Sequence, residues 1–196
     1  MTLKTYSQNC GLAAALDIIG ERWTLLIIRA LMPGPMRFGE IRTQLPGIGT
    51  NLLSERLKSL ERRGVIERLD GPKTGYVLTA KGEALGPIVR QLAAWGRDYL
   101  PIAGAADHPS WTMFNLEAAF RPERAEGVDA VVEFDIAGDR FHLVIRKQHC
   151  RGLPGPATAP DVSIRLEGNL LPGERTRLNI HGDADMFDRV RPCFAL

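Results

Sequence analysis

Apolar residues in the first hundred positions recur every three or four residues, the spacing of side chains on one face of an α-helix. The stretch 23–32 is apolar on nearly every side and therefore belongs in the core. A later helix has Thr79 available as its cap, but Pro87 lies a few residues inside it and favours a later start. The pattern predicts helices over 12–19, 23–32, 36–45, 49–64 and 85–100.

The helix predicted over 49–64 has two chemically different faces. One face is apolar and carries Leu52, Leu53, Leu57 and Leu60, whereas the other carries Thr50, Asn51, Ser54, Glu55 and Lys58. Arg62 and Arg63 add positive charge near the C-terminal end, and Gly64 is expected to end the helix. Short polar side chains followed by a lysine are typical of a helix that reads bases with its first turns and meets phosphate along its flank. An ordinary amphipathic surface helix shows the same two faces.

The segments on either side favour the DNA-reading interpretation. The short helix before it starts near Arg37 and is closed by Pro46 and Gly47, so the two helices form a helix-turn-helix. After it, 65–69 and 76–78 read as two strands around a turn that carries Lys73, which predicts a winged helix. The candidate DNA contacts are Arg37, Thr50, Asn51, Ser54, Lys58, Arg62, Arg63 and Lys73.

Charge divides the chain into two halves. Residues 1–100 carry 14 Lys and Arg against 9 Asp and Glu, and residues 101–196 carry 11 against 14, so the first half is the candidate for a polyanionic partner. A length of 196 residues is comfortable for two domains. No apolar run approaches the roughly 18 residues of a membrane span, and the N-terminus lacks a signal-peptide pattern. A soluble, cytoplasmic protein with no membrane partner is therefore expected.

The second half changes from helical spacing to strand alternation. A linker is predicted over 101–109 and a short apolar helix over 111–120. Alternating apolar residues then predict strands over 128–136, 141–145, 162–167 and 178–180, with a loop over 152–160 and a final helix over 184–190. The fold class is α+β: a winged helix-turn-helix domain over 1–100, followed over 110–196 by an antiparallel sheet covered by helices.

From Cys10 to Trp95 the chain resembles the HxlR family of winged-helix transcriptional regulators. The matching residues include Trp23-Thr24-Leu25-Leu26, Arg37-Phe38, Leu45-Pro46-Gly47-Ile48, Arg56-Leu57, Gly64-Val65-Ile66 and Lys81-Gly82, in order and at family spacing. The resemblance implies a homodimer, joined through its first and last helices, that binds a pseudo-palindromic operator in double-stranded DNA as repressor or activator. Two features depart from the family: Gly49 stands where a capping serine is usual, and the wing turn is short.

Residues 111–196 resemble sterol carrier protein type two-like domains. The order of elements and the segment from Leu178 to Asp183 carry this resemblance. It implies an apolar tunnel between sheet and helices, and hence an apolar small-molecule effector. The candidate pocket walls are Trp111, Phe114, Phe134, Phe141, Met186 and Phe187. For any one of these residues the simpler reading, that it fills the core, is favoured. The alternative function is a lipid or small-molecule carrier whose helical half serves dimerisation.

Enzymatic readings find little support. His142, His149, Cys150, His181 and Asp183 match no known metal-ligand spacing, and no carboxylate orients the histidines in sequence. No phosphate loop, dinucleotide fingerprint or nucleophile elbow is present. We therefore expect a protein that is not an enzyme and that has no catalytic residue, cofactor or metal site.

Cys10 allows two interpretations. A thiol near a helix N-terminus feels the positive end of the helix dipole, which lowers its pKa, and some HxlR-like proteins carry a redox-sensing thiol there. Against this, the neighbours Leu12, Ala13 and Ala14 are apolar, and free cysteine is among the most buried residue types. The sequence favours a buried structural thiol over a redox sensor.

Overall fold

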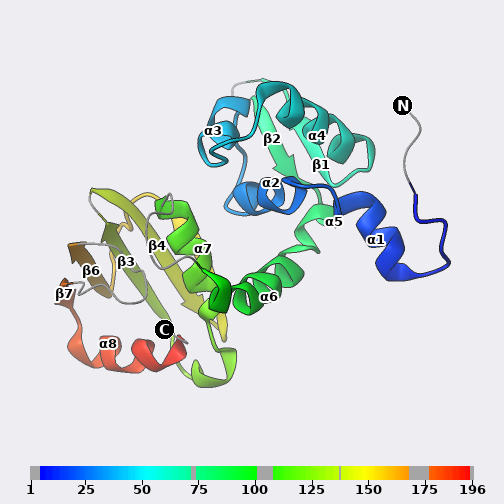
Figure 1. Ribbon diagram of the computed structural model, residues 1–196. Coiled ribbons are helices and arrows are strands. Elements are labelled where there is room, and N and C mark those ends of the chain that lie inside the picture. The colour runs from blue at the N-terminus through cyan, green and yellow to red at the C-terminus, as the bar shows by residue number, and fades with distance from the viewer. Residues whose placement is uncertain (1–4, 72–73, 101–107, 137, 168–176, 195–196) are drawn as a thin grey trace. The chain divides into compact units, whose positions relative to one another are not determined.

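The computed structural model describes residues 5–71, 74–100, 108–136, 138–167 and 177–194. The chain divides into two compact units, Met1–Val89 and Arg90–Leu196, and each is considered by itself (Figure 1).

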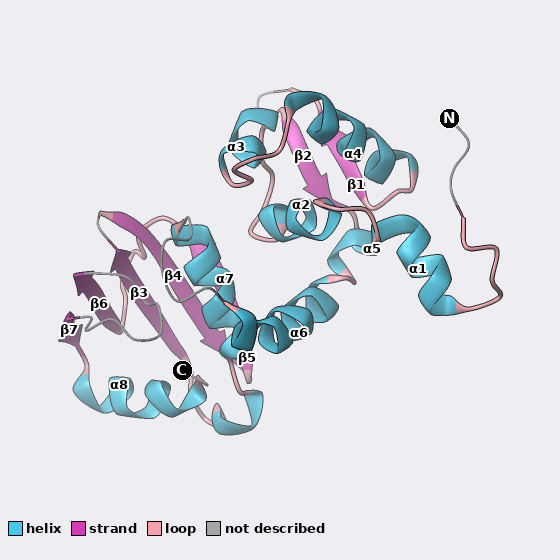
Figure 2. Cartoon of the chain, viewed as in Figure 1, coloured by secondary structure: helices cyan, strands magenta, loops and turns pink. Residues whose placement is uncertain are grey.

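The first unit is a bundle of short helices with a two-stranded sheet (Figure 2). The helices predicted over 12–19, 23–32, 36–45 and 49–64 are all present, with bounds that differ by a few residues. The elements are α1 (Gly11–Ile19), α2 (Thr24–Leu31), α3 (Phe38–Thr43), α4 (Thr50–Arg62), β1 (Ile66–Leu69), β2 (Gly75–Leu78) and α5 (Ala80–Glu83), after which α6 (Gly86–Gly96) begins.

The apolar faces predicted from the sequence form the core of this unit. Ile27, Ile28 and Leu31 of α2 are buried, as are Leu53, Leu57 and Leu60 of α4. Gly64 has a φ of +68°, a left-handed conformation that glycine adopts without strain, and it follows directly on the end of α4. β1 and β2 pair antiparallel, with Ile66 opposite Leu78, so the hairpin of a winged helix is present.

The helix predicted over 85–100 is present as α6, but Thr79 does not cap it. The Thr79 hydroxyl instead caps the short helix α5, by accepting a hydrogen bond from the Gly82 N–H at 3.3 Å. α5 ends after one turn, and α6 starts afresh with Pro87 in its first turn, where a residue without an N–H is tolerated. A 3₁₀ turn, Arg97–Tyr99, follows α6.

The second unit is a five-stranded sheet with helices on one face (Figure 1). Its elements are α7 (Pro109–Ala119), a 3₁₀ turn (Pro122–Arg124), β3 (Ala130–Ile136), β4 (Asp139–Arg146), β5 (His149–Pro154), β6 (Val162–Glu167), β7 (Arg177–Gly182), α8 (Ala184–Val190) and a final 3₁₀ turn (Arg191–Cys193). Inward side chains of β3, β4 and β6 pack with Met113 and Leu116 of α7 and Val190 of α8. The predicted one-sided sheet under helices is therefore present, and the fold is α+β.

The prediction of a fully antiparallel sheet is wrong at one pair of strands. The strand order is β5-β4-β3-β6-β7, and β3 pairs with β6 in parallel. The cause is the segment 155–161, which crosses the polar face of the sheet. Gly155 O lies 3.0 Å from His142 Nδ1, the Ala157 N–H donates to Glu133, and the Asp161 N–H donates to Val131 O. This crossing returns the chain to the start of β3, so β6 runs in the same direction as β3.

The loop predicted over 152–160 starts too early, because Gly152, Leu153 and Pro154 belong to β5. The core-facing positions of β5 are small because α7 lies directly on this strand. A Cβ added at Gly152 would lie 2.5 Å from the side chain of Met113. β5 therefore lacks the bulky alternating residues by which strands are recognised in a sequence.

Among the described residues, no helix is both long and apolar enough to cross a membrane.

Candidate nucleic-acid interface

α4 presents its polar face to solvent, while Leu53, Leu57 and Leu60 are buried and Leu52 is half-buried. Thr50, Asn51, Glu55 and Lys58 are exposed, and Ser54 is half-buried. These side chains follow one another along the face opposite Leu53 and Leu57, as the sequence predicted. Hydrogen-bonding groups are therefore exposed along the first two turns of a helix whose opposite face packs into the core.

The start of α4 has no side-chain cap. Gly49 occupies the N-cap position with extended backbone angles, and its carbonyl accepts from the Leu53 N–H at 2.9 Å. A glycine cap leaves N–H groups of the first turn without the oxygen that a serine would supply.

Basic side chains gather along α4. Lys58 and Arg62 are exposed and Arg63 is half-buried, while the Arg63 carbonyl accepts a hydrogen bond from Lys81 Nζ at 2.9 Å. Arg37 is exposed at the start of α3. In the part of the chain that the structure describes, none of the four candidates Arg37, Lys58, Arg62 and Arg63 forms an ion pair with a carboxylate. Lys73 lies outside the described residues.

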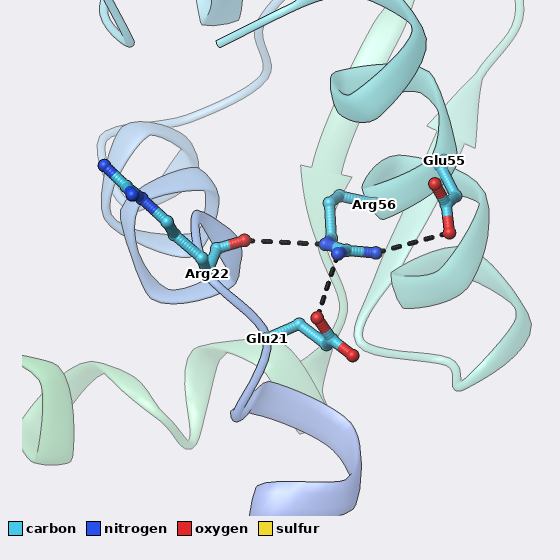
Figure 3. A network of polar contacts seen from close by, with 4 residues as sticks. All are labelled: Glu21, Arg22, Glu55 and Arg56. Atoms are coloured by element: carbon cyan, nitrogen blue, oxygen red, sulfur yellow. Dashed lines mark hydrogen bonds and ion pairs between the residues drawn. The ribbon is translucent and has the colours of Figure 1, made fainter. Parts of the chain in front are cut away.

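Arg56 is a residue of this helix that the sequence interpretation did not single out. Its guanidinium pairs with Glu21 at 2.9 Å, donates from Nε to the Arg22 carbonyl at 3.4 Å and approaches Glu55 at 3.5 Å (Figure 3). The side chain is only 16% exposed. The one available signal was its place among the residues shared with HxlR regulators, because its partners lie far away in the sequence.

Large apolar side chains are exposed on α1 and α6. Leu12 is 69% exposed and Trp95 67%, and the rings of Trp95 and Tyr99 lie 5.0 Å apart. The other members of this exposed apolar set are Leu16, Ile88, Leu92 and Leu100. Exposed apolar side chains of this size, on α1 and separately along α6 to Leu100, are typical of surfaces that other molecules cover.

In the second unit, the candidate pocket walls lie in or beside the core. Phe134 and Phe141 stack with ring centroids 5.0 Å apart, and both are buried, as is Phe114. Trp111, Met186 and Phe187 are half-buried. A surface pocket of about 390 Å³ lies elsewhere, lined by Ala125, Gly127, Val128, Asp129, Lys147 and Gln148.

The three cysteines differ in environment. Cys10 is exposed at the N-cap of α1, and the backbone N–H groups of Ala13 and Leu12 lower the pKa of its thiol. The favoured interpretation of a buried Cys10 is wrong, because the neighbouring Gly11 and Leu12 are exposed and only Ala13 of the first turn of α1 is buried. Burial, together with the nearby Glu117 carboxylate, raises the pKa of Cys150 to about 12. Cys193 is buried, with its sulfur 3.2 Å from the Arg124 carbonyl.

The histidines of the second unit have local roles. His142 bonds to the crossing segment, and His149 Nδ1 lies 2.8 Å from the Lys147 carbonyl. Within the described ranges, no three His, Cys, Asp or Glu side chains come together as a set of metal ligands.

A helix-turn-helix followed by a short hairpin defines a winged helix-turn-helix protein. The chain belongs to the HxlR-like helix-turn-helix family, whose sequence profile matches residues 18–103. It is therefore a transcriptional regulator with a DNA-binding helix-turn-helix.

Two relatives from Bacillus subtilis (strain 168) illustrate the likeness. The uncharacterized HTH-type transcriptional regulator YvaP is 42% identical over 90 residues, which cover 44% of this chain and 83% of that protein. The HTH-type transcriptional regulator YodB is 41% identical over 90 residues, with 44% and 80% covered. The crystal structure of quinone-bound YodB is similar over 46% of this chain and 99% of that chain, at 40% identity and a TM-score of 0.41.

Proposed function

We propose that α4 enters the major groove of an operator. Thr50, Asn51 and Ser54 contact base edges, whereas Lys58, Arg62 and Arg63, together with Arg37 and Lys73, contact phosphates. The observation that carries this proposal is the pairing of two opposite faces on one helix: leucines held in the core, and polar and basic side chains exposed without carboxylate partners among the described residues.

We further propose that the protein acts as a homodimer through the exposed apolar residues of α1 and α6. A two-fold dimer presents two copies of α4, which fits a pseudo-palindromic operator with half-sites about 34 Å apart. Analytical ultracentrifugation tests this assembly. A monomer that still binds one duplex tightly and site-specifically would contradict it.

The experiment for DNA reading uses a duplex that the wild-type protein selects from a random-sequence pool. Lys58→Ala removes one phosphate contact, so the slope of log K against log salt should fall by about 1 and all duplexes should weaken alike. Asn51→Ala should instead change sequence preference, by about 1–3 kcal/mol at one base pair. Lys147→Ala, the same change at an exposed lysine of the second unit, is the matched control and should leave both quantities unchanged.

For the second unit we propose a sterol carrier-like site for an apolar effector. The support is the set of half-buried side chains Trp111, Met186 and Phe187. Met186 and Phe187 pack against the core cluster that contains the stacked pair Phe134 and Phe141. Thermal unfolding with a series of fatty acids tests the site, because a ligand bound only by the folded state raises its stability. If no fatty acid shifts the midpoint, this assignment fails. A lipid carrier, the alternative function, would bind the fatty acid and select no duplex.

We also propose that Cys10 is a redox-responsive thiol. It is exposed and its pKa is lowered, and both properties favour reaction with peroxide. Two Cys10 thiols, one from each subunit, would give up two electrons and two protons to hydrogen peroxide, forming one disulfide and two waters. Peroxide should change duplex affinity in the wild type and not in Cys10→Ser. Identical responses in the two proteins would exclude the proposal.

A further inference from the structure

The turn between α1 and α2 has a backbone conformation that leaves little freedom to change. A Cβ at Gly20 would lie 2.5 Å from the Leu16 carbonyl oxygen, so the chain passes too close for any other residue. Trp23 has a φ of +79°, which is rare and strained for a residue with a side chain. Arg22 lies over the Trp23 ring, 5.3 Å from its centroid. Such a turn can act as a rigid support for what it contacts.

This turn contacts the helix-turn-helix at two points. At the first, a Cβ added to Gly47 would lie 3.8 Å from the Trp23 indole, which places the ring beside the turn between α3 and α4. At the second, Glu21 and the Arg22 carbonyl receive the Arg56 guanidinium from the middle of α4 (Figure 3). α4 is therefore held both just before its start and midway along its length.

We propose that Glu21 and Arg56 form a positioning pair that sets the angle of α4 for base reading; this inference rests on the proposed function. Asn51 lies five residues before Arg56, roughly 7.5 Å along the helix axis. A rotation of about 10° around Arg56 would move Asn51 by about 1 Å, which is more than the distance range of a hydrogen bond allows. Long, flexible lysine and arginine side chains tolerate such a shift when they bind phosphate.

The position of the pair also links α4 to α1. Glu21 follows the C-terminal end of α1, which carries the exposed Leu12 and Leu16 of the proposed dimer surface. In a dimer, the Glu21–Arg56 ion pair would hold α4 in one orientation to α1 and so fix the separation of the two α4 helices. Weakening this ion pair should therefore relax the preference for one half-site spacing as well as the preference for one base sequence.

The decisive variant is Glu21→Gln, because Glu21 is 61% exposed and its side chain can be replaced without opening the core. The measurement compares affinity for the duplex selected by the wild type with affinity for an unrelated duplex of equal length. Glu21→Gln should lower the ratio of the two affinities at least about ten-fold, the effect of losing one base contact, with affinity for the unrelated duplex unchanged. The variant should also distinguish less sharply than the wild type between the selected duplex and duplexes whose half-sites are moved by one base pair.

Two further variants separate an effect on the orientation of α4 from a general effect of removing charge. Glu61→Gln removes the same charge from an exposed carboxylate of α4 and should leave the affinity ratio at its wild-type value. Arg56→Lys keeps the charge but loses the planar fork, and should act like Glu21→Gln. The double variant Glu21→Gln/Arg56→Lys should lower the affinity ratio by less than the two single reductions multiplied together, because both substitutions break the same contact.

The inference is overturned if Glu21→Gln keeps the wild-type ratio, or if it weakens both duplexes by the same factor. It is also overturned if Glu61→Gln lowers the ratio as much as Glu21→Gln does. A wild-type protein that selects no duplex from the pool would instead refute the proposed function itself. Thermal unfolding of each variant, expected to match the wild type within a few degrees for Glu21→Gln, shows that the loss lies in binding and not in folding.

Discussion

The cations of α4 in the first unit and those on the sheet of the second unit differ in their partners. In the second unit, Asp135 pairs with both Arg140 and Arg165, and Glu117 pairs with Arg90 at 3.3 Å. In the first unit, Lys58 and Arg62 have no carboxylate partner among the described residues. Neighbouring cations without partners repel one another, so a chain that keeps them on one helix face gains nothing in folding stability. The unpaired cations of α4 therefore suit this helix to meet a polyanion.

Apolar side chains show a contrast between the helices α1 and α6 and the sheet. Leu12, Leu16 and Ile88 of the first unit and Leu92 and Trp95 at the start of the second are exposed, while β3 and β4 bury their large apolar residues under two helices. An exposed apolar group forgoes the roughly 25 cal/mol per Å² that burial supplies, until a partner covers it. The first unit thus exposes its functional groups at the surface, and the second keeps its proposed pocket walls in or beside the core.

The largest effect that tests this contrast is on folding. Leu57 and Leu143 are buried completely in the first and second unit, respectively, and truncating either to Ala should cost about 2–5 kcal/mol. Because the units are separately compact, we expect each change to destabilise only its own unit. Hydrogen exchange followed by mass spectrometry reports the opening of each unit separately. Equal acceleration of exchange in both units by either variant would show that they unfold as one.

The two units also differ in how much of their structure could be predicted from the sequence. The faces of α4 were predictable because a helix between core and solvent must alternate apolar and polar side chains every three to four residues. β5 was not, since its buried residue Gly152 fits the narrow space beside Met113 of α7 and has no strand propensity.

Long-range partners account for the remaining differences. The parallel pairing of β3 with β6 depends on hydrogen bonds from the segment 155–161 to other strands. Arg56 could be placed on α4, but its contact with Glu21 joins residues 35 positions apart. The exposure of Cys10 depends on where the N-terminal end of α1 lies, which local hydrophobicity does not determine. Sequence therefore predicted most elements, the hairpin and the polar face of α4, but not β5 or the contacts between residues far apart in the chain.

Thiol chemistry gives the next largest difference between the units. Cys10 has a lowered pKa and is exposed, whereas the pKa of Cys150 is about 12 and Cys193 is buried. At neutral pH, alkylation of Cys10 should be at least about a hundred-fold faster than that of Cys150, since the thiolate is the reacting form. Mass spectrometry of iodoacetamide-treated native protein identifies the labelled site. Cys10→Ser should remove the fast phase, and fast labelling of Cys150 would contradict the buried environment.

A smaller effect concerns the buried carboxyl of Glu117. Burial raises its pKa, opposed by the hydrogen bond from the Gly152 N–H and by Arg90. A raised folded-state pKa means that the folded unit binds a proton more tightly than the unfolded chain does. Stability contributed by this proton is present at low pH and is lost as pH rises from about 4 through the folded pKa, at no more than about 1.4 kcal/mol per pH unit.

Glu117→Gln should remove this pH dependence from the second unit. Glutamine can still accept the Gly152 N–H but does not ionise. Urea unfolding at pH values from 4 to neutrality, with Glu126→Gln as a control at an exposed carboxyl of the same unit, measures the slope. A slope that is the same in the wild type and in Glu117→Gln would mean that the carboxyl ionises equally in the folded and unfolded states.

The smallest effect is expected at the cap of α4. Gly49 already has the extended backbone angles of an N-cap residue, and a Cβ added there meets no atom within 4 Å. Gly49→Ser should raise the unfolding free energy of the first unit by a few tenths of a kcal/mol, because the hydroxyl can accept from an N–H of the first turn. Gly49→Ala adds the same Cβ without the hydroxyl and should lower it instead. Equal unfolding free energies for the two variants would show that the cap contributes nothing here. A gain for serine that comes with weaker duplex binding would indicate that the uncapped N–H groups of α4 are kept for the DNA, in line with a unit whose polar groups await a partner.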